Sequence, residues 1–242
     1  SIEMPILAID GSDIQIATDP NDSDSYFPGT NGQKDYNLLH LNALYKIKHQ
    51  VYVNSIIQKA KDKNEHKALQ EMVDNSSISK ALVIADRGYE SYNNLAHIQE
   101  KEWFYLIRIK DGKSGIKHGL ILPDESEFDV HFTLKLTRKQ TKETKELFKD
   151  RNHYKFVPAN TTFDYLTVKN KKSDPTKFYE LKFRIVRFPL SEDKFETIIT
   201  NLDADAYPML KIKELYDSRW GIETSFRDLK YTICLLYTSG AA

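Results

Sequence analysis

A short apolar run that ends in an acidic turn constrains the fold of this chain more than any other feature of its sequence. Residues 81–85 read Ala-Leu-Val-Ile-Ala, and Asp86-Arg87-Gly88 follow directly. A continuous apolar run of this length is typical of a strand buried on both faces, as in parallel sheets covered by helices. The pattern predicts an α/β core with Asp86 at the carboxyl end of a strand, where open α/β sheets place their ligands.

Before and after this strand, segments with strand-like patterns alternate with segments with helical patterns. Residues 5–17 hold two apolar stretches around Asp10-Gly11-Ser12, so we expect a hairpin with its turn there. The polar, Asp- and Gly-rich residues 18–37 are expected to form a loop. Further strands are expected over residues 38–47, 50–58 and 103–110, and helices over residues 64–75 and 91–100. Alternation of this kind indicates an α/β core.

The character of the chain changes after Asp111. Four segments rich in β-branched and aromatic residues are predicted to be strands: 131–137, 165–168, 178–188 and 196–200. We therefore divide the chain into a first part of the core (1–110), a β-rich insertion (111–205), a helical return to the core (206–233) and a tail (234–242). The basic stretch 138–155 is expected to be a solvated face or loop, with DNA contact as the alternative.

Composition limits the classes of function. The 242 residues carry 35 basic and 35 acidic side chains, so there is no global electrostatic case for nucleic acid, although a local basic face stays open. The single cysteine, Cys234, excludes an internal disulfide framework and favours the reducing cytosol, so a metal would sit on carboxylates or histidines. No apolar run approaches the roughly 20 residues of a membrane span and no leader is evident, so membrane and secreted classes are not expected.

A second constellation lies in the helical pattern of residues 207–233. At about 100° per residue, one arc of about 60° carries Tyr216, Arg219, Glu223 and Lys230. An apolar stripe adjoins it, made of Leu215, Ile222, Phe226, Leu229 and Ile233. A carboxylate flanked by cations suits a phosphodiester bound to a metal ion, with Glu223 as ligand and the cations on phosphate oxygens. The alternative is a surface helix with i,i+4 ion pairs such as Arg219 to Glu223.

Asp10 and Asp86 each stand near the end of an apolar strand and close to a glycine. If the two strands are neighbours, both carboxylates and Glu223 can make a three-carboxylate site, which suits Mg²⁺. The alternative for each aspartate alone is a turn or cap residue.

The spacing Tyr216-x2-Arg219-x3-Glu223-x6-Lys230, within YDSRWGIETSFRDLK, resembles the YREK signature of the IS-four family of bacterial DDE transposases. Four fixed residues match by chance in about one such chain in a thousand. AIDGSDIQI resembles the first-Asp strand of that family and ADRGYES resembles its second-Asp segment. The resemblance covers nearly the whole chain in the same order, including the β-rich insertion before the glutamate.

The resemblance implies an RNase H-like mixed sheet with helices on both faces, interrupted by the insertion. It implies that Asp10, Asp86 and Glu223 hold two Mg²⁺ ions, for which Mn²⁺ can substitute. The implied activity is cleavage of double-stranded DNA at transposon ends through a hairpin intermediate, followed by strand transfer. The full-length protein would act as a homodimer in a synaptic complex, in the bacterial cytoplasm at the nucleoid. The implied DNA contacts are Tyr216, Arg219 and Lys230, with Arg87, Arg108 and Lys110 as weaker candidates whose alternative is a structural or solvated role.

The sequence departs from the family pattern in three places. The stretch that carries a base-stacking Trp in some members has none here, and Phe195 is its nearest aromatic, which we expect to be a core residue with stacking as the alternative. The chain starts at Ser1, only a few residues before the first-Asp strand, so we expect it to lack the N-terminal region with which the family helps to read transposon ends. After Ile233 the sequence reads CLLYTSGAA, and CLLYTS can be encoded by a transposon-end adapter used in sequencing libraries. We therefore expect residues 234–242 to be a non-native tail on a catalytic-domain fragment, with a divergent C-terminus as the alternative.

Two other classes of function stay open. A catalytically silent or repurposed relative would bind DNA without cutting it, and a β-rich interaction module would do neither. A salt titration of DNA binding with a Mg²⁺-dependent nicking assay separates the three.

Overall fold

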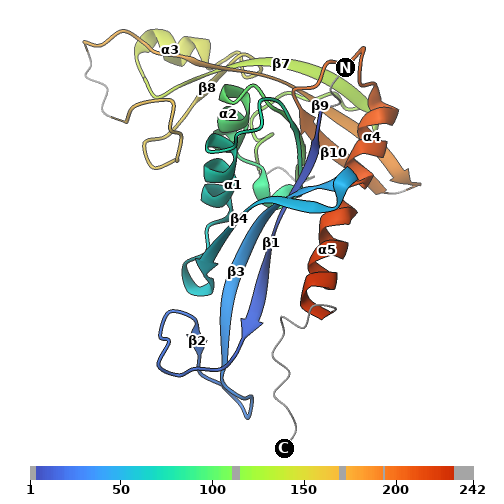
Figure 1. Ribbon diagram of the computed structural model, residues 1–242. Helices are drawn as coiled ribbons and strands as arrows, with labels where there is room; N and C mark the ends of the chain where they lie inside the picture. The colour runs from blue at the N-terminus through green and yellow to red at the C-terminus, as the bar shows by residue number, and fades with distance from the viewer. Residues whose placement is uncertain (1–3, 111–114, 169–172, 193, 232–242) are drawn as a thin grey trace, which may run out of the picture. The chain divides into compact units, whose positions relative to one another are not determined.

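The computed structural model describes residues 4–110, 115–168, 173–192 and 194–231 (Figure 1). The chain divides into two compact units, here called the first unit (residues 1–84 and 215–242) and the second unit (residues 85–214). Both contain helices and strands, so the predicted α/β class is confirmed. The predicted tail, residues 234–242, lies outside the described residues, and the predicted domain boundaries stay a prediction.

The first unit is built on a mixed sheet. Its strands are β1 (Ile6–Ile16), β2 (Tyr26–Phe27), β3 (Tyr36–Lys46), β4 (Val51–Lys59) and β5 (Leu82–Ala85), which runs on by one residue into the second unit. β1 lies between β3, which is antiparallel to it, and β5, which is parallel to it. β3 also pairs with β2 and β4. The predicted parallel strand at residues 81–85 is thus confirmed as β5.

β1 is one unbroken strand of 11 residues, so the predicted hairpin turn at Asp10-Gly11-Ser12 is wrong. Pairing with β3 continues through these three residues. A Cβ added at Gly11 would lie 2.5 Å from Oε1 of Glu65 and 2.6 Å from Nε2 of His40. Glycine stands here because neighbouring side chains approach the backbone closely, and not because the chain turns.

Two helices pack on opposite faces of the first unit's sheet, α1 (Glu65–Asp74) against β3 and β4 and α5 (Trp220–Tyr231) against β1 (Figure 1). α1 begins at Asn64, whose side chain accepts a hydrogen bond from the backbone N–H of Lys67, as helix N-caps do. Its buried face consists of Ala68, Leu69, Met72 and Val73, which confirms the predicted helix and its apolar side. α5 packs Ile222 and Phe226 against Ala8 of β1 and against β3. Short 3₁₀ turns stand at η1 (Ile47–His49) and η2 (Ala60–Asp62).

The predicted single helix over residues 207–233 is wrong, because it is divided into α4 (Met209–Asp217) and α5. Between them the backbone N–H of Ser218 donates to the carbonyl of Leu215 at 3.2 Å, and that of Arg219 donates to Tyr216 at 3.0 Å. The Ser218 hydroxyl also donates to the Leu215 carbonyl, at 2.5 Å. At this point the backbone bonds run to the third residue back, as in a 3₁₀ turn, and not to the fourth. Arg219 therefore stands between two helices.

The second unit contains a sheet in the order β6-β10-β9-β7-β8. Its elements are η3 (Arg87–Tyr89), α2 (Tyr92–Glu100), β6 (Phe104–Arg108), β7 (Phe128–Thr137), α3 (Lys142–Leu147), β8 (Tyr154–Phe156), β9 (Tyr179–Ser191), β10 (Lys194–Thr200) and most of α4. Neighbouring strands are antiparallel except β7 and β8, which are parallel. The strands predicted at 103–110, 131–137, 178–188 and 196–200 and the helix predicted at 91–100 are confirmed.

The strand predicted at residues 165–168 is wrong, because this segment forms a turn. The Arg138 side chain donates hydrogen bonds to four backbone carbonyls, those of Pro158, Thr161, Phe163 and Leu166. These bonds hold residues 158–166 in an irregular path. Arg138, the first residue of the basic stretch 138–155, is thus committed to backbone contacts.

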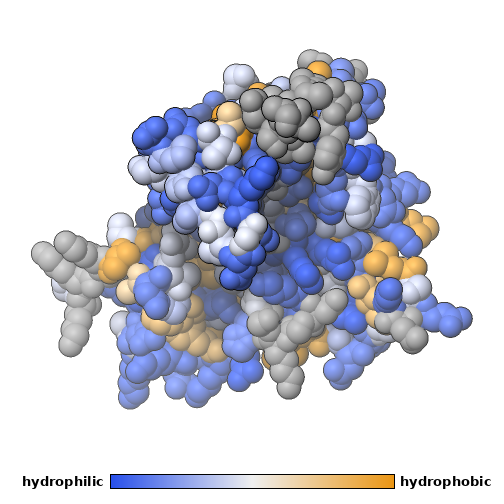
Figure 2. All heavy atoms as spheres, turned by 90° about the horizontal axis from the view of Figure 1, so that it is seen from below, coloured by the Kyte–Doolittle hydropathy of each residue, from blue (hydrophilic) through white to orange (hydrophobic). Residues whose placement is uncertain are grey.

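The surface seen in Figure 2 is largely hydrophilic, with apolar patches between the charged side chains. The most exposed large apolar residues include Ile57, Ile121, Leu210 and Trp220. Within the described part of the chain, no helix is both long enough and apolar enough to cross a membrane.

Candidate active site

Asp10 lies in the middle of β1, on the face that α5 covers. Side chains two residues apart on a strand share a face, so Asp10 lies between Ala8 and Ser12. Ala8 belongs to the same apolar cluster as Ile222 and Phe226 of α5. The Ser12 hydroxyl accepts a hydrogen bond from Nζ of Lys230 at 2.6 Å. Contacts to α5 thus stand on both sides of Asp10.

Arg219 connects two of the predicted carboxylates. Its Nη2 lies 2.5 Å from Oε1 of Glu223, which is the i,i+4 ion pair that the surface-helix alternative expects. The side chain is only 13% exposed. Burial opposes its charge, but the nearby Tyr216, Glu223 and Asp10 outweigh burial and raise the pKa of Arg219. The guanidinium is therefore a fixed cation that interacts with Asp10 and with Glu223.

Two aromatic rings flank the same guanidinium. The centroid of the Tyr216 ring lies 5.9 Å from Cζ of Arg219, and that of Trp220 lies 5.6 Å from it. Tyr216 is buried, whereas 63% of Trp220 is exposed. The structure thus gathers Tyr216, Arg219 and Glu223 where α4 ends and α5 begins, with Lys230 farther along α5. Trp220 was not singled out from the sequence, although it stands inside the motif.

Asp86, the other predicted carboxylate, belongs to the second unit. It follows β5 and caps η3, because its Oδ1 accepts a hydrogen bond from the backbone N–H of Gly88 at 2.8 Å. This is the cap role that we kept as the alternative. A Cβ at Gly88 would lie 2.9 Å from the same oxygen, so glycine makes room for the carboxylate.

Two of the three weaker DNA-contact candidates take part in contacts within the second unit. Nε of Arg108 lies 3.2 Å from Oε1 of the buried Glu196. Nζ of Lys110 lies 3.7 Å from Oε1 of Glu90, whose other oxygen accepts from the Lys110 backbone N–H at 3.0 Å. Arg87 is exposed on η3. Contacts of this kind match the structural alternative, and a DNA role for these residues stays a prediction.

Phe195 on β10 is half-buried, and the Arg187 guanidinium lies 4.8 Å from the centre of its ring. One face of the ring is therefore covered by a cation. Base stacking by Phe195 stays an untested alternative.

The donor chemistry of Asp10 and Glu223 fits Mg²⁺, which prefers carboxylate oxygens. Across residues 4–231, apart from the undescribed gaps, no three His, Cys, Asp or Glu side chains are gathered closely enough to hold a metal ion. Because Glu223 is bonded to Arg219, a metal ion at this carboxylate has to compete with the guanidinium. The oxygens suit the ion, and the ion pair must open or share its carboxylate.

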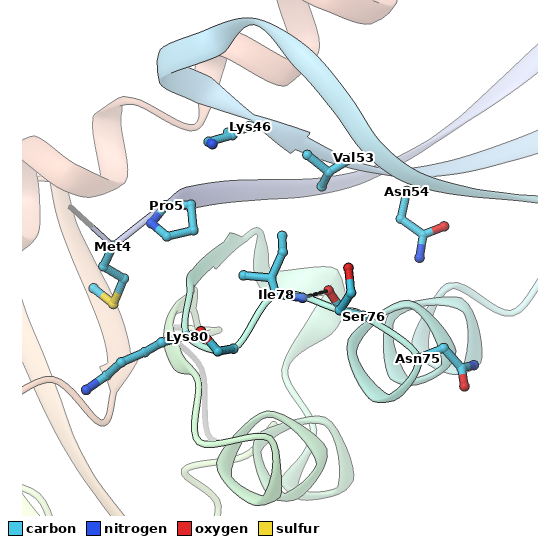
Figure 3. Close-up of a pocket in the computed structure, with 11 residues that line it drawn as sticks. Met4, Pro5, Lys46, Val53, Asn54, Asn75, Ser76, Ile78 and Lys80 are labelled. Carbon is cyan, nitrogen blue, oxygen red and sulfur yellow. Dashed lines mark hydrogen bonds between the residues drawn. The ribbon is translucent and has the colours of Figure 1, made fainter. Parts of the chain in front are cut away.

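A pocket of about 950 Å³ in the first unit is separate from these residues (Figure 3). It is lined by Lys46 of β3, by Val53 and Asn54 of β4 and by the loop that follows α1, residues 75–80. Among the described residues, no carboxylate lines it. The candidate site is therefore the α5-covered face of β1.

A second polar cluster lies on the opposite face of β1, and the sequence did not predict it. It consists of Asp13, His40 and Glu65, whose side chains lie in contact. The available signal was a histidine at position 40 inside the apolar run 38–47.

Residues 2–237 match the protein family described as "Transposase DDE domain". No curated protein shows significant similarity to the chain. A similar solved structure is the "Cryo-EM structure of piggyBac transposase synaptic complex with hairpin DNA (SNHP)", with 11% sequence identity and a TM-score of 0.48. The similarity covers 96% of this chain and 44% of that one, so the chain spans less than half the length of that protein.

Proposed function

Because the chain belongs to the family of transposase DDE domains, we propose that it is the catalytic domain of an IS-four, YREK-type DNA transposase with an RNase H-like core. The proposed reaction is cleavage of double-stranded DNA at transposon ends through a hairpin, then strand transfer. One observation carries the proposal: Asp10 acts electrostatically on Arg219, the cation that pairs with Glu223. We also propose that the full-length protein acts as a homodimer in a synaptic complex. Its proposed location is the bacterial cytoplasm, at the nucleoid.

Asp86 is the proposed third carboxylate. β1 and β5 run parallel in the register Ile6↔Leu82, Leu7↔Val83 and Ala8↔Ile84. The same offset relates Asp10 to Asp86. Asp86 follows the carboxyl end of β5, where open α/β sheets gather their ligands, and Asp10 lies just beyond the part of β1 that pairs with β5, which supports a shared role for the two aspartates.

The three carboxylates would hold two Mg²⁺ ions, or Mn²⁺ in their place. Metal ions at such sites neutralise phosphate charge and lower the pKa of bound water. Arg219 would bind a non-bridging phosphate oxygen, because a guanidinium forms short, charge-assisted hydrogen bonds with phosphate. Lys230, held over β1 by its bond to Ser12, would bind a second. In the structure, the ion pair between Arg219 and Glu223 satisfies both charges.

The decisive test compares Glu223→Gln with Asp228→Asn, which neutralises an exposed carboxylate on the same helix. We expect Glu223→Gln to weaken Mn²⁺ binding at least about 10-fold in calorimetry and to abolish metal-dependent nicking of a supercoiled plasmid. DNA binding should persist, and Asp228→Asn should behave like the wild type. Nicking retained by Glu223→Gln would show that another residue supplies the ligand.

A second test concerns the cations. Arg219→Gln and Lys230→Gln should each lower the salt slope of DNA binding by about one charge, whereas Lys67→Gln on α1 should not. An unchanged slope would favour the surface-helix alternative. A steep slope without any nicking would identify a repurposed DNA-binding relative, and the absence of both would identify an interaction module.

A further inference from the structure

His40 of β3 is buried between two carboxylates on the α1-covered face of β1. Only 1% of the residue is exposed. Its Nδ1 lies 2.5 Å from Oδ1 of Asp13 on β1, and its Nε2 lies 3.0 Å from Oε1 of Glu65 on α1. Nζ of Lys63, just before α1, lies 3.1 Å from the other oxygen of Asp13. The cluster thus ties one strand to its neighbour and to a helix.

The two carboxylates and His40 favour one another's charged forms, whereas Lys63 opposes the charge of His40. Burial lowers the pKa of His40, but Glu65 and Asp13 outweigh burial and raise it. The pKa of Glu65 is lowered, chiefly by its bond to His40, and the nearby Lys63 and His66 add to this effect. Burial opposes the charge of Asp13, but its bonds to His40 and Lys63 lower its pKa. The two carboxylates thus favour the charged form of His40 more than water does.

The cluster contacts β1 at Gly11 and Asp13, which alternate along the strand with Asp10 and Ser12 of the candidate site. Gly11 and Asp13 face the cluster, and Asp10 and Ser12 face α5, because successive side chains of a strand point to opposite faces. A Cβ at Gly11 would meet both His40 and Glu65, so the backbone at Gly11 lies directly against the cluster. The cluster thus packs on the face of β1 opposite to the Asp10 side chain.

We propose that His40 is a positioning residue, which fixes the segment of β1 from Gly11 to Asp13 and so holds the Asp10 carboxylate in place for metal binding. This inference rests on the proposed function, because it assigns Asp10 to the metal. Groups that hydrogen-bond directly to the ligands of a metal site commonly change metal affinity by about 10–100-fold when they are removed, so we expect the lower end of this range for His40. Here the effect is transmitted through a strand and not through a direct bond.

The test measures Mn²⁺ affinity by calorimetry in folded protein at low temperature. We expect His40→Leu to weaken Mn²⁺ binding about 10-fold and His40→Gln, which can still bond to Asp13 or Glu65, to recover part of the loss. The matched control is His97→Leu in the second unit, which removes another buried histidine paired to an aspartate, with Nε2 2.8 Å from Asp164. That variant should bind Mn²⁺ like the wild type.

A pH profile gives a readout that a merely structural role would not move. Mn²⁺ affinity of the wild type should decline as the pH rises above 6.5 through the raised pKa of His40, whereas that of His40→Gln should stay flat. Wild-type affinity in folded His40→Leu, or an equal loss in His97→Leu, would overturn the positioning role and leave the proposed function standing. Failure of the wild type to bind Mn²⁺ would overturn the proposed metal site and the positioning role together.

Discussion

Replacing Gly11 by alanine tests whether the centre of β1 is as tightly packed as the structure indicates. The added methyl carbon would lie 2.5 Å from Oε1 of Glu65 and 2.6 Å from Nε2 of His40. Each side chain would have to withdraw by roughly 0.8 Å to reach ordinary contact, and both are held by their mutual ion pair. Overpacking of this kind costs about 1–3 kcal/mol.

The opposing effect is smaller. Alanine reduces the conformational freedom of the unfolded chain, which stabilises the fold by about 0.4–1 kcal/mol. We therefore expect Gly11→Ala to lower the free energy of unfolding by about 1–2 kcal/mol. Urea unfolding followed by far-UV circular dichroism should show a lower midpoint with little change in slope.

Gly221→Ala is the matched control, since this glycine lies in the first turn of α5. A Cβ there would lie 3.6 Å from Cγ2 of Ile47 and 3.8 Å from Cε1 of Tyr45, which are ordinary contacts. Alanine is preferred to glycine in helices, so this variant should be more stable by up to about 1 kcal/mol. If Gly11→Ala were as stable as the wild type, the close-packing explanation of Gly11 would be wrong.

Two further predictions concern stability. The contribution of His40 is fully present below pH 6.5 and is lost as the pH rises through its raised folded-state pKa, so urea midpoints between pH 6 and pH 9 should fall more in the wild type than in His40→Gln. Arg138→Lys cannot reproduce four carbonyl bonds and should destabilise the second unit by about 1–3 kcal/mol in the same assay. Its DNA salt slope should match that of the wild type, and a slope lower by about one would instead place Arg138 on DNA.

Parts of the fold that depend on local pattern could be predicted from the sequence. β5 follows from an unbroken apolar run, and α1 follows from a capping asparagine and an apolar face. The turn predicted at residues 10–12 and the single helix predicted over residues 207–233 were wrong because the same local sequence is compatible with two structures. Gly11 suits a turn as well as a close contact, and the decisive neighbours, His40 and Glu65, lie far away in the sequence. Likewise, nothing in the helical pattern signals that the backbone between Ser218 and Ile222 would bond to the third residue back and divide the helix.

The candidate site divides in the same way. Helical spacing alone was enough to predict the i,i+4 ion pair of Arg219 and Glu223, because that contact is local. That Lys230 would bond to Ser12 depends on the packing of α5 on β1, which no local pattern encodes. The cluster around His40 was missed for the same reason, because its members come from two strands and a helix.

One face of β1 carries the candidate site and the other face packs against the His40 cluster, so the length of this strand is as important as its composition. Inserting or deleting a single residue before Asp10 would exchange the two faces for the whole remainder of the strand. Asp10 and Ser12 would then turn toward α1, and Gly11 and Asp13 would turn toward α5. We therefore expect β1 to accept many single substitutions but to change in length only by two residues, or by one residue that a β-bulge absorbs.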